Sequence, residues 1–250
     1  MARHSHWAQI KLKKGALDKK RGKIFTRHAH LIEVAARQAG GDPNMNASLR
    51  IVIENARADN MPRENIDRAI KKGTGELKGA AHMEEITYEA YGPGGIALVI
   101  DTLTDNKNRT SQFVRTALQK HGGSLGSMGS TSFLFETKGV IAVNAKTDRD
   151  NDELELIDAG AEDIEETEGG FIVYCSANEC AGVKKKLQEK SFTVESAELT
   201  KVPKNTVHIT DPAVAKKILS LMEALEDEDD VSNVAANFEI ESRATARLSQ

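Results

Sequence analysis

The residues with the most evident chemistry are the cations of one short stretch near the start of the chain. The stretch KLKKGALDKKRGKIFTR, residues 11–27, holds eight Lys or Arg and a single Asp. Cations packed this densely repel one another, and the phosphate oxygens of a nucleic acid would neutralise them. We therefore predict nucleic-acid contacts from Lys11, Lys13, Lys14, Lys19, Lys20, Arg21, Lys23 and Arg27.

Two plainer interpretations of this basic segment stay open. It could be a solvated arm without a specific partner, or an arm that docks on the acidic part of its own chain. The net charge is −4, but residues 1–78 carry 17 Lys and Arg against 8 Asp and Glu, whereas residues 79–250 carry 17 against 30. Such an asymmetry favours a basic module with a polyanionic partner, carried on an acidic body.

A second candidate site is the stretch TLTDNKNRT, residues 102–110, which leads from an expected strand into an expected helix. We place Asn108 or Arg109 just before the first helical turn. There the backbone N–H groups and Arg109 could hold an anion. Simple capping of the helix explains the same residues equally well.

The other polar clusters of the sequence indicate neither a metal site nor a catalytic site. The pairs HSH at 4–6 and HAH at 28–30 are poor metal sites, because residues two apart on a helix point in different directions. The acidic run EDEDD, residues 226–230, is expected to be a solvated helix end that repels phosphate. With no nucleophile motif, metal cluster or cofactor motif, we expect a protein that is not an enzyme and has no cofactor.

The composition fits a water-soluble globular chain. Hydrophobic residues make up 39% and charged residues 29%, and the longest apolar run, IALVI at 96–100, is too short for a membrane span. No apolar signal segment follows the basic N-terminus. The two cysteines, Cys175 and Cys180, are expected to be reduced thiols, so we predict a cytoplasmic protein.

Periodicity predicts a flexible arm over residues 1–22, followed by three short helices. The first two cover residues 23–39 and 47–58. The third begins near Pro62 and ends at Gly73, and a linker follows at 73–82. Further helices are expected at 110–120, 152–159, 177–189 and after Asp211-Pro212. Strands are expected at 85–91, 95–101, 132–136, 139–144, 162–168, 170–175, 192–199, 205–210 and 236–240.

From residue 139 onward the expected order is β-α-β-β-α-β, the ferredoxin-like pattern. The strands and helices on either side of it are too few to bury a core alone, so we predict that they combine. The predicted fold class is α+β, a helical N-terminal domain and two α/β domains, one inserted in the other. The expected boundaries are 1–78 for arm and helices, 79–130 plus 204–241 for the discontinuous domain, and 131–203 for the ferredoxin-like insertion.

Five motifs in register resemble the YebC/PmpR family of bacterial regulatory proteins, which includes mitochondrial translational activators. They are HWAQIKLKKGALDKKRGKIFT, NMPRENIDRAIKKGTGE, YEAYGPGGIALVIDTLTDNKNRT, DAGAEDI and LEDEDDV. The resemblance covers nearly the whole chain and implies three domains, one interrupting another. It departs at Arg3, His6 and Leu12. The matching site positions are Lys11, Lys14, Lys19, Lys20, Arg21, Lys23, Asn106, Asn108, Arg109 and Thr110.

The resemblance implies a non-enzymatic regulator of gene expression, for which DNA-binding transcriptional regulation is the first hypothesis. A translation factor that binds ribosomal RNA and relieves stalling, for example at consecutive prolines, is the alternative. The expected partner is DNA or ribosomal RNA, with the ribosome in the second case and no membrane in either. The sequence predicts no oligomeric state.

Overall fold

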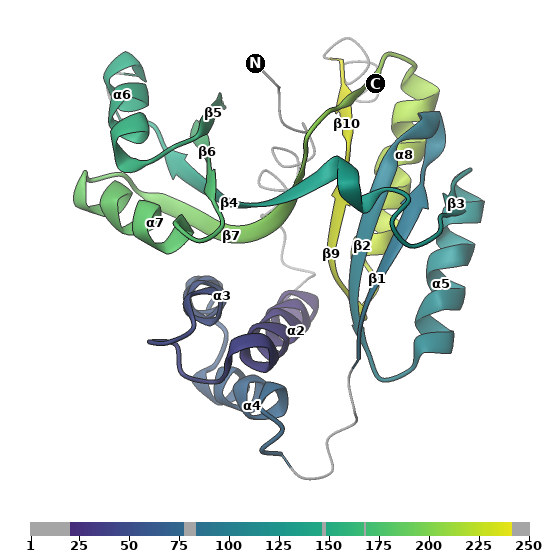
Figure 1. Cartoon of the computed structure of the whole chain (residues 1–250), viewed down its shortest axis with the longest axis horizontal. Helices are drawn as coiled ribbons and strands as arrows, with labels where there is room; N and C mark the ends of the chain where they lie inside the picture. The colour runs from purple at the N-terminus through teal and green to yellow at the C-terminus, as the bar shows by residue number, and fades with distance from the viewer. Residues whose placement is uncertain (1–20, 78–83, 147–148, 168, 242–250) are drawn as a thin grey trace.

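The structure is a computed structural model that describes residues 21–77, 84–146, 149–167 and 169–241. Residues 1–20, which hold most of the predicted arm, lie outside this part of the chain. The predicted fold class is confirmed, with a helical N-terminal region followed by α/β structure (Figure 1). None of the helices in the described residues is both long and apolar enough to cross a membrane.

Three helices form the N-terminal region between residues 21 and 77: α2 (Arg21–Ala39), α3 (Ala47–Ala58) and α4 (Arg63–Gly73). The bounds of α3 are those predicted. The first helix begins at Arg21 rather than at residue 23, and Pro62 takes the N-cap position instead of the first turn. A small core of Ile32, Leu49, Ile53 and Ile66 holds the helices together.

The second part is a four-stranded antiparallel sheet in the order β3-β1-β2-β9. Its strands are β1 (Glu84–Tyr91), β2 (Ala97–Thr104), β3 (Ser124–Leu125) and β9 (Val231–Ala236). The short 3-10 turn η1 (Pro93–Gly95) joins β1 to β2. Next to this sheet, β8 (Val207–Ile209) and β10 (Phe238–Ile240) pair in parallel.

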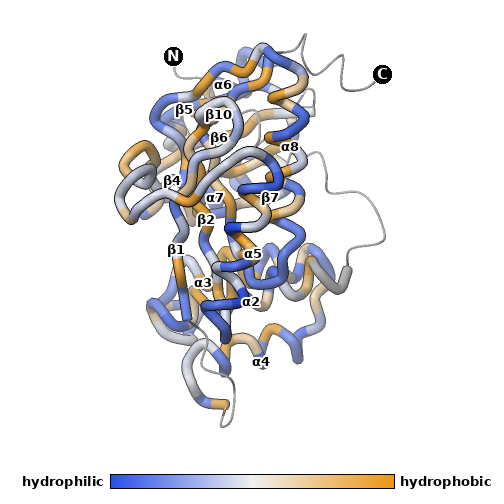
Figure 2. The backbone as a smooth tube through the Cα atoms, turned by 90° about the vertical axis from the view of Figure 1, so that its right-hand side faces the viewer, coloured by the Kyte–Doolittle hydropathy of each residue, from blue (hydrophilic) through white to orange (hydrophobic). Residues whose placement is uncertain are grey.

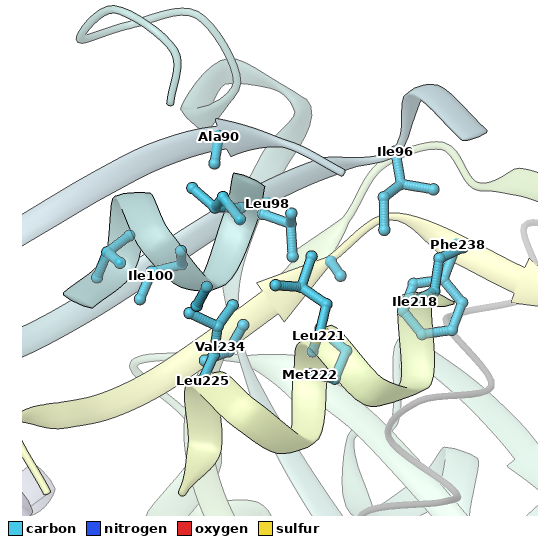
Figure 3. Packing of buried hydrophobic residues seen from close by; sticks show 14 of the residues in the cluster. Ala90, Ile96, Leu98, Ile100, Ile218, Leu221, Met222, Leu225, Val234 and Phe238 are labelled. Carbon is cyan, nitrogen blue, oxygen red and sulfur yellow. The ribbon is translucent and has the colours of Figure 1, made fainter. Parts of the chain in front are cut away.

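Alternating residues of β2 pack on opposite faces of this sheet. Ile96, Leu98 and Ile100 contact the helices α5 (Lys107–Lys120) and α8 (Pro212–Glu226), and Figure 3 shows Ile218, Leu221, Met222 and Leu225 of α8 packed below them. Ala97 and Val99 face the other side, where Phe135 covers them. The period of two therefore places apolar side chains on both faces of a central strand.

The third part is a second antiparallel sheet, in the order β5-β6-β4-β7. It comprises β4 (Phe135–Asn144), β5 (Asp163–Glu166), β6 (Gly170–Ser176) and β7 (Val194–Pro203), and the 3-10 turn η2 (Ser132–Leu134) precedes it. The helices α6 (Arg149–Ala159) and α7 (Cys180–Glu189) pack on one face. The element order β4-α6-β5-β6-α7-β7 is the predicted ferredoxin-like pattern.

Two strand predictions were wrong. The stretches 132–136 and 139–144 were expected to be separate strands, but β4 runs unbroken from Phe135, because β6 and β7 hydrogen-bond to it on both sides. Residues 231–235 were assigned to no element, between the acidic run at 226–230 and the strand expected at 236–240. They belong to β9 instead, which pairs with β2.

The three-part division of the chain stays a prediction, and sheet order supports it. After β7 the chain returns through α8 to β9, which pairs with β2 from before the ferredoxin-like unit. The helical region contacts both other parts. Asn55 of α3 donates a hydrogen bond of 2.5 Å to the carbonyl of Ala197 in β7, and α2 lies beside β9 (Figure 1).

Figure 2, turned by 90° from Figure 1, places α2 and α4 at the lower end of the molecule. Hydrophilic and hydrophobic positions alternate along both helices, as expected for helices that bury one side only (Figure 2). Polar residues of α4, among them Arg68 and Lys71, are exposed.

Candidate nucleic-acid interface

The predicted site residues belong to two segments of the sequence. Five of them, Lys11, Lys13, Lys14, Lys19 and Lys20, lie outside the described residues. Arg21 and Lys23 belong to the first turns of α2, and Arg27 follows one turn later with its side chain partly exposed. The basic segment therefore leads directly into a helix that is packed against the rest of the protein.

The second group lies where β2 ends and α5 begins. β2 continues to Thr104 and α5 starts at Lys107, so only residues 105 and 106 connect them. The N-cap is Asn106, whose side-chain oxygen accepts a hydrogen bond of 3.1 Å from the backbone N–H of Arg109. Our placement of Asn108 or Arg109 before the first turn was wrong, because both lie inside the helix.

Arg109 forms ion pairs within the protein. Its Nη2 donates to both carboxylate oxygens of Asp230, at 2.7 and 2.9 Å, and to Oδ1 of Asp105 at 3.0 Å. The hydrogen bond and charge of Asp230 raise the pKa of Arg109. Two carboxylates thus surround the guanidinium that we predicted to face an anion.

Thr110 completes the same cluster from the buried side. Its hydroxyl donates to Oδ2 of Asp230 at 2.7 Å and lies 2.8 Å from the hydroxyl of Thr104, and the Thr110 side chain is fully buried. It cannot touch a nucleic acid in this arrangement. Its evident effect is to hold Asp230 and the start of α5 together.

Asp230 is the residue that local sequence patterns did not reveal. It was expected to lie in a solvated helix end, but its side chain is only 10% exposed and sits directly before β9. Burial opposes ionisation, yet the hydrogen bonds from Arg109, Thr110 and Thr104 outweigh it and lower the pKa of Asp230. A strand prediction for VSNVAA, residues 231–236, would have placed this carboxylate at a sheet end.

The helix α2 lies against one end of the first sheet. His30 of α2 is close enough to Asp230 and Asp229 for their charges to raise its pKa, although burial lowers it more strongly. Arg37 and Gln38 at the other end of α2 reach Glu85 at the start of β1. The helix that continues the basic segment therefore lies against the end of the sheet that carries residues 104–110 (Figure 1).

The histidines of the HAH pair have separate partners. Nε2 of His28 lies 2.6 Å from Oδ2 of Asp59, while His30 is influenced by the charges of Glu33 and Asp230. Within the described part of the chain, no group of three or more His, Cys, Asp or Glu could hold a metal ion. The HSH pair lies outside that part.

Two family models match the chain. The TACO1/YebC N-terminal domain matches residues 5–76, and the second and third TACO1/YebC domains match residues 83–238. The chain belongs to the TACO1/YebC family. The resemblance found from its motifs is thereby confirmed.

Full-length relatives of this TACO1/YebC protein carry the name "Probable transcriptional regulatory protein". One from Persephonella marina is 49% identical and covers 100% of both chains, and one from Fervidobacterium nodosum is 51% identical, covering 96% of this chain and 95% of its own. The crystal structure of a conserved hypothetical protein from Aquifex aeolicus is similar with a TM-score of 0.86 and 46% identity. It covers 95% of this chain and 98% of the other.

The cluster around Asp230 in this TACO1/YebC member gives a first prediction. Thr110→Val keeps the shape of the side chain but removes the hydroxyl that Asp230 accepts from, so a buried carboxylate oxygen loses a donor. We expect a loss of about 2 kcal/mol in the free energy of unfolding, measured by urea denaturation. Thr116→Val is the matched control, because this exposed hydroxyl bonds only the carbonyl of Gln112, and it should cost less than about 0.5 kcal/mol. Equal losses in both variants would contradict a stabilising role for the cluster.

Proposed function

We propose that this protein is a non-enzymatic regulator of gene expression that binds nucleic acid through its basic segment and N-terminal helices, in the cytoplasm. The names of its relatives support regulation of transcription as the first form of this role. The proposal rests on the segment 11–27, with its eight cations and one Asp.

The structural observation that best supports the proposal is a set of cations on the helical region that form no ion pair with described residues. Five cations between residues 24 and 77 form no ion pair with any residue that the structure describes. They are Arg27, Arg50, Arg57, Arg68 and Lys71. Unpaired cations that follow a basic segment extend the electrostatic footprint for a phosphate backbone.

The cluster at residues 104–110 contributes less than predicted. Arg109 is neutralised by Asp105 and Asp230, and Thr110 is buried. In our proposal, Asn106 and Asn108 stay candidate contacts because both are exposed, and Arg109 contacts phosphate only if it exchanges its carboxylate partners. Thr110 acts by positioning the others.

One observation favours the alternative, a translation factor that binds ribosomal RNA. Readout of DNA bases in the major groove needs a helix with a free face of Arg, Asn or Gln side chains. On α3, Ile51 packs into the ferredoxin-like core and Asn55 bonds Ala197. On α2, Arg37 and Gln38 are held by Glu85. These contacts occupy Asn55, Arg37 and Gln38 and leave arginines on the same helices unpaired among the described residues, which suffice to bind a phosphate backbone without base readout.

Parallel binding assays at the same salt concentration distinguish a transcriptional regulator from a translation factor. The chain is tested for co-sedimentation with ribosomes and for mobility shifts of promoter fragments against scrambled DNA. Sequence-selective shifts without ribosome association support transcriptional regulation, and ribosome association with unselective DNA binding supports the translation factor. Failure to bind DNA, RNA and ribosomes would contradict both. Metal-dependent cleavage of nucleic acid by the pure protein would contradict the non-enzymatic role.

A further inference from the structure

The two cysteines of the chain face one another inside the ferredoxin-like unit. Cys175 lies near the end of β6 and Cys180 is the first residue of α7, and both are fully buried. Both are free thiols. The Sγ of Cys175 lies 3.7 Å from the carbonyl oxygen of Gly139, the residue that pairs with it across the sheet.

Gly139 shows how close the two sulfur atoms are. A Cβ placed on this glycine would lie 2.7 Å from each of the two Sγ atoms and 2.6 Å from the Cβ of Cys180. Both sulfurs therefore occupy the space that a side chain at position 139 would need. Two sulfur atoms that both lie 2.7 Å from one point are near neighbours, and such proximity is what a disulfide needs.

The surroundings make the two thiols unequal. The hydrogen bond from Cys175 lowers the pKa of Cys180, and the charge of Lys184, one turn further along α7, acts in the same direction. The hydrogen bond with Cys180, followed by burial, raises the pKa of Cys175. Because Cys180 is also the first residue of α7 and a helix N-terminus favours a thiolate, we assign Cys180 as the nucleophile of the pair and Cys175 as the resolving thiol.

We propose that Cys175 and Cys180 form a redox-active dithiol site that a small peroxide oxidises to an intramolecular disulfide. Both sulfurs are fully buried, so any oxidant reaches them only through a local opening, and a small peroxide needs a narrower opening than a larger disulfide reagent. Disulfides that form in reducing compartments are usually transient and redox-active rather than structural. Nothing in the proposed nucleic-acid binding requires this pair.

The reaction balances with hydrogen peroxide as the only co-reactant. The Cys180 thiolate attacks one peroxide oxygen, the O–O bond breaks, and the leaving hydroxide takes up a proton as water. Cys180 is then a sulfenic acid. Cys175 loses its proton and attacks the Cys180 sulfur, the S–O bond breaks, and the hydroxyl leaves as a second water. Two S–H bonds are replaced by one S–S bond while the peroxide is reduced to two waters.

The site lies beneath the surface on which the N-terminal helices dock. Ile51 of α3 belongs to the same buried cluster as both cysteines. Lys184 of α7 forms an ion pair of 2.5 Å with Glu54 of α3. The proposed bond would thus tie the first turn of α7 to β6 next to the contact between the helical region and the ferredoxin-like unit.

Intact mass measurement tests the proposal on the full chain. The reduced protein is treated with hydrogen peroxide, then unfolded in the presence of a maleimide that labels every free thiol. We expect a mass lower by two hydrogen atoms, no maleimide on the oxidised species, and a peptide map that joins residues 175 and 180. Labelling of both cysteines after peroxide treatment would overturn the proposal, as would oxidation of Cys180 to a sulfinic acid without a disulfide.

Single substitutions test the assigned order of attack. Cys175→Ser should leave Cys180 as a sulfenic acid that dimedone traps, whereas Cys180→Ser should leave Cys175 unoxidised and fully labelled by maleimide after unfolding. Circular dichroism checks that each variant folds, and the measurement on the unaltered chain decides the proposal if one does not. A dimedone adduct on Cys175 and none on Cys180 would reverse the assignment and overturn it.

Discussion

Replacing Lys11, Lys13, Lys14, Lys19 and Lys20 together by glutamine should weaken nucleic-acid binding on the order of a thousandfold at about 0.1 M salt. Each lysine that neutralises a phosphate releases a condensed counterion, and the five substitutions remove that contribution without changing the size of the segment much. Binding should weaken to a similar extent for all sequences, because these contacts carry no base information. Fluorescence anisotropy with labelled RNA and DNA duplexes measures the affinity.

A charge-matched variant separates a local contact from the overall charge of the protein. Lys120, Lys185, Lys186, Lys216 and Lys217 are exposed lysines of the α/β body, and replacing all five by glutamine changes the net charge by the same amount. We expect this control to retain most of the affinity. An equal loss in both variants would mean that the basic segment has no special role and that net charge alone governs binding.

Glu89→Gln should cause the largest loss of stability among single substitutions of the described polar residues. The carboxylate of Glu89 is buried and accepts hydrogen bonds from the backbone N–H groups of Gly129, Thr131 and Ser132 at 2.5–2.8 Å. An amide in its place turns one acceptor into a donor that faces these N–H groups. We expect a loss of about 3 kcal/mol in the free energy of unfolding, measured by urea denaturation near pH 7.

The same carboxylate predicts a pH dependence. Burial raises the pKa of Glu89, but the hydrogen bonds from Thr131, Gly129 and Ser132 outweigh it and lower the pKa from 4.5 to about 2. Its folded-state pKa is below the unfolded value, so its contribution to stability is present above about pH 4.5 and is lost as the pH falls towards 2. The difference between the unaltered chain and Glu89→Gln should therefore shrink below pH 4.5.

Glu153→Gln, at an exposed position of α6, is the control for this stability measurement and should cost less than about 0.5 kcal/mol. A Glu89→Gln variant as stable as this control would show that the carboxylate does not hold residues 129–132 in place. A difference that stayed constant down to pH 2 would contradict the lowered pKa.

Elements with strong local signals could be predicted from the sequence. The helix at 47–58 was placed at its observed bounds, because Asn46 caps it and its apolar residues repeat with helical spacing. The Asp211-Pro212 start of α8 was also correct, with Asp211 accepting a hydrogen bond from the backbone of Ala213. In both cases a capping side chain and the residues it caps are neighbours in sequence.

Features that depend on distant partners could not be predicted. β9 contains Ser232 and Asn233, so it shows no long apolar run, and it becomes a strand by pairing with β2. The neutralisation of Arg109 has the same origin, because Asp230 reaches it only once β9 is in place beside β2. The 102–110 stretch was expected either to hold an anion or simply to cap the helix. In the structure Asn106 caps the helix and Arg109 pairs with two carboxylates of the same chain, and binding of an external anion stays a prediction.

The most direct test of the central claim is the salt dependence of nucleic-acid binding by the unaltered chain. If about six cations contact phosphates, the logarithm of the binding constant should fall linearly with the logarithm of salt concentration, with a slope near −5 on duplex DNA and about a thousandfold loss between 50 and 200 mM. The account predicts this slope. A slope near zero, or no binding at about 50 mM salt, would contradict it.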